Sequence, residues 1–107
     1  NLLNIDSDIS WVARVRLAGL LLDMNKPVEA LSILPEKIPS IWIGIVSDRR
    51  GDALMALGKK VEARSAWVRA LEVYGVDRAE GVARNMIKMK LATIDSLQVV
   101  DKKSGAK

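Results

Sequence analysis

The sequence predicts an all-α fold of the α-solenoid type, with two two-helix repeats followed by a capping helix. Apolar residues recur at spacings of three and four, and no segment between turn signals alternates strictly between apolar and polar residues. The chain also matches itself after a shift of 33 positions. With 107 residues, of which 50% are hydrophobic, it is long enough for one packed domain. We expect this domain to cover residues 1–97, with repeats at about 11–43 and 44–76, a capping helix at about 78–97 and a flexible basic tail at 98–107.

The first repeat is expected to hold two helices of unequal length. Asp6, Ser7 and Asp8 can cap a helix that runs to about Met24, because short polar side chains accept hydrogen bonds from free helical N–H groups. A second helix at about 28–34 ends before Pro35, since proline breaks a helix interior.

The second repeat and the capping helix follow the same rules. Ser40 is expected to cap a helix at about 41–57 that ends at Gly58. A further helix at about 60–74 ends before Gly75, and Asp77 caps the last helix.

The internal repeat is the most informative signal in the chain. Arg16 falls on Arg49, and residues 28–30 fall on 61–63 with the same sequence, Val-Glu-Ala. A period near 34 with two helices per unit is typical of tetratricopeptide repeats. In that repeat, small residues twelve positions apart let paired helices approach, a turn residue favours a left-handed backbone, and a large apolar residue fills the second helix. The residues assigned to these positions are Ala18, Ala30, Gly51 and Ala63 for the small sites, Asn25 and Gly58 for the turns, and Leu34 and Trp67 for the large sites, with Ala70 at the next small one.

Composition argues against catalysis and cofactor binding. The chain has no His and no Cys, which excludes Cys/His zinc sites, Ser-His-Asp triads and cysteine nucleophiles. Its glycines form no phosphate-binding loop. Four aromatic residues are too few for a base-stacking platform. We therefore expect no enzyme activity, no cofactor, no metal and no nucleic-acid partner.

Charge is distributed unevenly along the chain. Residues 1–58 carry 6 basic and 7 acidic side chains, whereas residues 59–107 carry 11 and 6. A basic half could meet anionic lipid or nucleic acid, but interspersed acidic residues favour a solvated helical surface. No run approaches the roughly 18 apolar residues that a membrane span needs.

Repeat geometry points to one face for binding a partner protein. The first helix of each repeat lines the concave face of a solenoid, where a peptide or a partner helix can lie. Mapped by repeat position, the candidate partner-binding residues are Val12, Arg16, Gly19, Asp23, Ile45, Arg49, Asp52, Ala56, Asn85, Lys88 and Met89.

Two further groups of residues have alternative interpretations. Two interpretations fit the charged residues of the second repeat: a partner contact or, more simply, interhelical ion pairs. These residues are Asp48, Asp52, Arg49, Arg50 and Arg64. Met55, Met86 and Met89 read as an adaptable binding surface or, more commonly, as core. Trp11, Trp42 and Trp67 are expected in the core or covering an interface.

Over residues 10–97 the sequence resembles the C-terminal domain of YfgM-like proteins. The stretch from Asp48 to Trp67 carries most of the likeness, and its Ala-Arg-Ser-Ala-Trp ending at 63–67 is not a generic repeat feature. Arg-Val-Arg-Leu-Ala at 14–18, Pro-Val-Glu-Ala-Leu at 27–31 and Met-Ile-Lys-Met-Lys-Leu at 86–91 also match.

The resemblance implies a role in protein translocation. Members of that family are inner-membrane proteins with a periplasmic helical-repeat domain, described as ancillary subunits of the Sec translocon that associate with a membrane-anchored periplasmic chaperone. It implies a chain at the periplasmic face of the inner membrane, attached only through a segment outside this sequence. The alternative is a tetratricopeptide scaffold of another complex, and an open repeat edge would allow weak homodimers.

Overall fold

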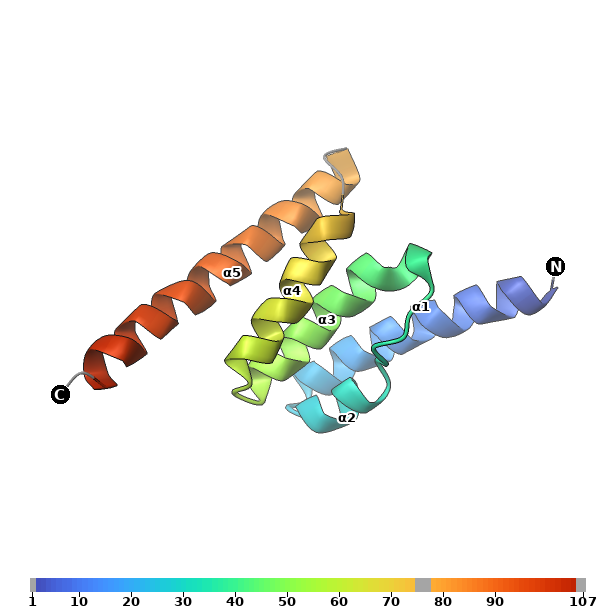
Figure 1. Ribbon diagram of the computed structural model, residues 1–107. Coiled ribbons are helices and arrows are strands. Elements are labelled where there is room, and N and C mark those ends of the chain that lie inside the picture. Colours follow the sequence, from blue (N-terminus) through green and yellow to red (C-terminus); the bar gives the residue numbers. More distant parts are fainter. Residues whose placement is uncertain (1, 75–77, 106–107) are drawn as a thin grey trace.

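The computed structural model describes the backbone of residues 2–74 and 78–105, and the side chains of residues 10–74 and 80–97. Within these ranges every regular element is a helix, which confirms the all-α prediction (Figure 1). In chain order the elements are α1 (Leu2–Asp23), α2 (Pro27–Ser32), the 3-10 helix η1 (Ser40–Trp42), α3 (Ile43–Ala56), α4 (Lys60–Val73) and α5 (Arg78–Gly105).

The helices follow one another as a row, with α1 and α5 at its two ends (Figure 1). The turns α1–α2 and α3–α4 share one backbone motif. Asn25 and Gly58 have positive φ angles of 60° and 77°. In each turn the following lysine N–H donates to a carbonyl five residues back, at 2.8 Å for Lys26 and 2.9 Å for Lys59. These are the hydrogen bonds of a Schellman helix end, so both repeats turn by the same mechanism.

Small residues let the α3–α4 pair pack closely. Gly51 faces the indole of Trp67, and a Cβ built on Gly51 would lie 2.7 Å from Trp67 Cε2. The indole N–H of Trp67 donates to the Asp48 carbonyl at 3.1 Å. Ala63 on α4 and Ala18 on α1 are fully buried. A larger residue at Gly51 would therefore push the two helices apart.

The core consists of two clusters that meet at α3. The first joins α1, α2 and α3, and the second joins α3, α4 and α5. The buried members are Val15, Ala18, Ala30, Leu34, Val46 and Ala53 in the first cluster, and Leu54, Ala63, Trp67, Ala70, Ile87 and Ile94 in the second.

Several helix ends differ from the sequence prediction. The first helix starts at Leu2, so residues 6–8 lie inside it and do not precede it. Ser40 is the first residue of η1, whose preceding residue, Pro39, makes no side-chain cap. The last helix runs to Gly105 and does not end near Leu97. The predicted cap at Asp77 lies outside the described residues, and the flexibility expected for the C-terminal tail stays a prediction.

Residues 33–39 form an irregular segment that begins before the predicted end of the second helix at residue 34. The second helix stops at Ser32, whose hydroxyl donates to the Glu29 carbonyl at 2.6 Å, and Pro35 prevents its continuation. Arg50 of α3 donates to the carbonyl of Leu34, and Arg69 of α4 donates to that of Glu36 at 3.0 Å. The two arginines thus satisfy backbone acceptors that a helix would otherwise have paired.

Candidate protein-binding face

One surface connects α1, α3 and α5, and we call it the α1–α3–α5 face. On its α1 side, a Cβ added to Gly19 would lie 3.8 Å from Arg49 Cζ of α3. On its α5 side, Lys90 Nζ lies 2.8 Å from Asp48 Oδ1 and 2.8 Å from Asp52 Oδ1 of α3. The first helices of both repeats and the last helix therefore contribute to one continuous surface.

The acidic and basic groups at the middle of this face balance one another. Asp48, Asp52 and Lys90 are each about a quarter exposed. Arg49 Nη1 lies 3.5 Å from Asp52 Oδ2. Two carboxylates and two cations therefore cancel in charge, and the Lys90 bridge ties α5 to α3.

Burial and charge shift the titration of this cluster. Burial raises the pKa of Asp48 above its usual value, although the Lys90 ammonium opposes that shift. Burial acts to lower the pKa of Lys90, but its hydrogen bonds to Asp48 and Asp52 outweigh burial, so that pKa is raised. The pKa of Tyr74 is also raised, first by burial and then by the charges of Asp48 and Glu80.

Two arginines on the α1 side of the face have hydrogen-bond donors without partners among the described residues. Arg16 is exposed and makes no hydrogen bond or ion pair among the described residues. Arg49 has a side chain 37% exposed, yet its Nε atom is buried without a hydrogen-bond partner in that part of the chain. Arg16 precedes Gly19 by about one turn on the same side of α1. Because Asp52 already balances the charge of Arg49, the positive character of this edge comes from Arg16.

The α5 side of the face is apolar. Val82, Met86 and Met89 are 61%, 55% and 70% exposed and follow one another at spacings of four and three. By helical geometry Met86 lies about 40° around α5 from Lys90, so this ridge borders the charged centre. The core interpretation of Met86 and Met89 is wrong, whereas Met55 does pack against the second core cluster.

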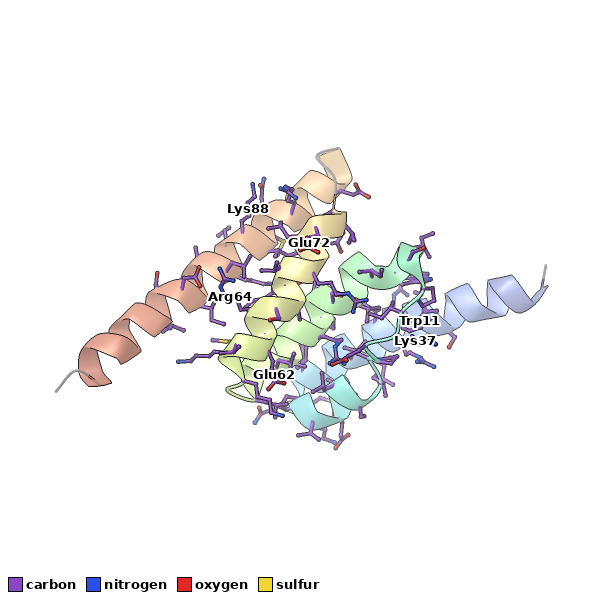
Figure 2. All side chains as sticks on the ribbon, in the orientation of Figure 1. Trp11, Lys37, Glu62, Arg64, Glu72 and Lys88 are labelled. Carbon is purple, nitrogen blue, oxygen red and sulfur yellow. The ribbon has the colours of Figure 1, made fainter. Side chains whose placement is uncertain are left out.

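The candidate residues all lie on α1, α3 or α5, but those on α5 are spread around that helix. Lys88 precedes Lys90 by two residues and so lies about 200° around α5, on the opposite flank. Figure 2 shows it on the exposed side of the helix. Sequence reasoning missed Lys90, because nothing in the sequence shows which flank of the last helix meets the second repeat. The other candidates lie on the three helices of the face, and Asn85 is about 140° around α5 from Lys90. They are Val12, Arg16, Gly19 and Asp23 on α1, Ile45, Arg49, Asp52 and Ala56 on α3, and Asn85 and Met89 on α5.

Within the expected group of Asp48, Asp52, Arg49, Arg50 and Arg64, Arg49 pairs with Asp52 inside α3, whereas Arg50 and Arg64 pair with residues outside the group. Arg50 Nη2 lies 3.4 Å from Glu36 Oε1, and Arg64 Nε lies 3.0 Å from Asp95 Oδ1 of α5. Figure 2 places Arg64 between α4 and α5. These charges hold neighbouring elements together, as the simpler interpretation expected, but with different partners.

A hollow of about 310 Å³ lies outside this face, between α3, α4 and the segment 33–39. Ser47 lines it, and the Ser47 hydroxyl is buried without a hydrogen-bond partner among the described residues. Arg50 and Arg69 also line it, but both already bind backbone carbonyls. The basic groups of the hollow therefore serve the fold.

The side chains and helices of the described ranges also bear on metal binding and membrane insertion. In the described ranges, no three His, Cys, Asp or Glu side chains gather as a metal site would require. No helix of the same ranges combines the length and apolar character needed to cross a bilayer.

Comparisons with known proteins bear on the family to which the fold belongs. The sequence profile of the family described as "Tetratricopeptide repeat-like domain" matches residues 4–98. An ancillary SecYEG translocon subunit of Escherichia coli K12 is 37% identical over 62 residues, which are 58% of this chain and 30% of that protein. The chain thus matches less than a third of that relative's length. No solved structure matches the chain.

Proposed function

The chain belongs to the tetratricopeptide repeat-like domain family, and from this premise we propose that it is a non-catalytic domain that binds a partner protein on its α1–α3–α5 face. The observation that carries the proposal is the make-up of this face. It combines an exposed apolar ridge on α5, a charge-balanced centre on α3 and uncompensated arginine on α1. Protein interfaces commonly combine exposed apolar anchors with charges that select the partner.

The narrower part of the proposal concerns the complex in which the domain acts. The E. coli relative is named as an ancillary subunit of the SecYEG translocon, and the shared segment is 37% identical. We propose that this chain belongs to such a subunit at the periplasmic side of the inner membrane, with translocon subunits and a membrane-anchored chaperone as partners. The second candidate is a scaffold of another complex, which the family assignment alone supports equally.

Co-purification tests both candidates. The full-length protein is tagged in its native host, extracted in mild detergent, and its bound proteins are identified by mass spectrometry. Recovery of translocon subunits supports the narrower proposal, whereas recovery of other partners supports the scaffold. Recovery of the protein alone refutes both.

Charge reversal tests the face. Arg16→Glu changes an exposed residue and should reduce recovery of the partner, as should Arg16→Glu with Arg49→Glu. The matched control is Lys37→Glu, which reverses one exposed lysine in the segment 33–39. Circular dichroism of each variant confirms folding. Equal partner recovery from Arg16→Glu and the lysine control would show that the face is not used.

A further inference from the structure

The four methionines of the chain lie in two different environments. Met55 packs against the second core cluster, whereas the side chains of Met24, Met86 and Met89 are 60%, 55% and 70% exposed. The chain has no Cys, so its thioether sulfurs are the side-chain atoms that a peroxide oxidises first. Three of the four methionines are therefore open to an oxidant from solvent.

Two of the exposed methionines lie on the α1–α3–α5 face and the third does not. Met86 and Met89 are three residues apart on α5 and form most of its apolar ridge. Met24 follows α1 directly, and its N–H donates to the Leu20 carbonyl at 3.0 Å, so it continues the helical turn. Helical geometry places Met24 about 140° around this axis from Gly19, on another side of the helix.

The packing of α5 does not depend on the two ridge methionines. Neither Met86 nor Met89 belongs to a core cluster of the described residues. Ile87 and Ile94, which are fully buried, make the core contacts of this part of α5. A polar group added to Met86 or Met89 would therefore change the surface of the helix and leave its packing in place.

A peroxide converts a thioether into a sulfoxide by transfer of one oxygen atom. A lone pair of the sulfur attacks one peroxide oxygen, so that an S–O bond forms and the O–O bond breaks. The proton on the transferred oxygen passes to the departing hydroxide, which leaves as water; sulfur loses two electrons and the peroxide gains them. The product is polar, and methionine sulfoxide reductases return it to methionine. Covering its oxygen with an apolar surface is unfavourable, because that oxygen then lacks a hydrogen-bond donor.

We propose that Met86 and Met89 form a peroxide-sensitive modification site, at which reversible oxidation to the sulfoxide releases the partner from the α1–α3–α5 face without unfolding the domain. This inference rests on the proposed function and adds a means of regulating it. A bound partner covers the ridge and so protects both sulfurs, which makes the free protein the form that reacts.

Oxidation of the purified full-length protein by hydrogen peroxide tests the chemistry. Peptide mass spectrometry follows each methionine over time. We expect Met24, Met86 and Met89 to react about tenfold faster than Met55, because a core sulfur is reached only when the structure opens. Circular dichroism should show an unchanged helical signal. Equal rates at Met55 and the ridge, or loss of the helical signal, would overturn the inference.

Partner recovery tests the consequence. The tagged full-length protein is oxidised, freed of peroxide and mixed with a mild-detergent extract of its native host. Proteins whose recovery depends on Arg16 should be recovered about tenfold less than with the unoxidised protein. Treatment with methionine sulfoxide reductases A and B, which together reduce both sulfoxide epimers, should restore their recovery.

Leucine variants assign the effect to the ridge. Met86→Leu with Met89→Leu keeps the ridge apolar without sulfur, so peroxide should leave its partner recovery unchanged. Met24→Leu is the matched control, because it removes an equally exposed methionine away from the face. Its recovery should fall on oxidation as it does for the unchanged protein. Sensitivity of the double variant, or resistance of Met24→Leu, contradicts the inference.

The inference and the proposed function fail in different ways. If the unoxidised protein recovers partners that depend on Arg16 and oxidation does not reduce their recovery, the inference fails and the proposed function stands. If the unoxidised protein recovers no partner, both fail.

Discussion

Gly51→Ala is the sharpest test of how the second repeat packs. An alanine Cβ at this position would lie 2.7 Å from Trp67 Cε2 and closer still to Nε1 and Cδ1. Trp67 is 4% exposed, so its indole has no free space into which it can move. Either α3 and α4 separate or the indole leaves its position, and both weaken the second core cluster.

The expected magnitude follows from three contributions. Overpacking of a core costs about 1–3 kcal/mol. Displacing the indole breaks its 3.1 Å hydrogen bond to the Asp48 carbonyl, which costs about 1 kcal/mol. Alanine gains about 1 kcal/mol over glycine within a helix, and this offsets the hydrogen bond. The net loss of unfolding free energy should be about 1–3 kcal/mol.

Gly19→Ala provides a matched control on α1. Its Cβ would meet only Arg49 side-chain atoms, the nearest at 3.8 Å, which is ordinary contact. Because only the helix propensity changes, this variant should be about 0.5–1 kcal/mol more stable than the unchanged protein.

Urea unfolding followed by circular dichroism compares the two variants, with tryptophan fluorescence as a second probe of two-state behaviour. If Gly51→Ala is stabilised as much as Gly19→Ala, the close approach at Trp67 does not exist and the packing argument fails. The double variant with Trp67→Phe adds a further check. Its loss should be smaller than the sum of the single losses, because the smaller ring relieves the clash.

Three other substitutions test separate parts of the structure. Trp67→Ala should cost about 3–5 kcal/mol in urea unfolding, and a loss below about 1 kcal/mol would contradict its place in the core. Lys90→Met should cost about 1.5–3 kcal/mol at pH 7 because it leaves half-buried carboxylates without their donor, whereas Lys88→Met should change stability by less than about 0.5 kcal/mol. The pKa of Asp48 is raised in the folded protein, so the folded state binds this proton more tightly than the unfolded state does. The contribution of Asp48 to the free energy of unfolding therefore rises as the pH falls through that pKa. The loss from Lys90→Met should therefore shrink between pH 7 and pH 4, and a pH-independent loss would show that Asp48 is not the unpaired group. Asp95→Asn should cost less than about 1 kcal/mol, since its pair with Arg64 is about half exposed; a larger loss in thermal unfolding would mean that this pair has a greater structural role.

Much of the fold followed from local rules that act within one repeat. The left-handed backbone at Asn25 and Gly58 is what a turn between paired helices requires, and the sequence shows suitable residues at both places. The close approach of α3 and α4 at Gly51 was likewise expected, because small residues twelve positions apart report how near two paired helices lie; that the Trp67 indole fills this place is a finding of the structure.

Helix ends were predicted less well, for a physical reason. Asp6, Ser7 and Asp8 are good caps, but a helix continues through such residues when the chain before them is also helical. Similarly, nothing in the tail after Leu97 stops a helix, because charged residues without Gly or Pro tolerate helical geometry up to Gly105.

The sequence alone determined the all-α repeat, its two turns and its small packing residues, because these depend on contacts within a 33-residue unit. Only the tertiary structure decided that Lys90 rather than Lys88 meets Asp48 and Asp52, and that Met86 and Met89 remain exposed beside it. The rotation of the last helix about its own axis selects both, and that rotation is set by packing of Ile87 and Ile94 against residues far away in the chain.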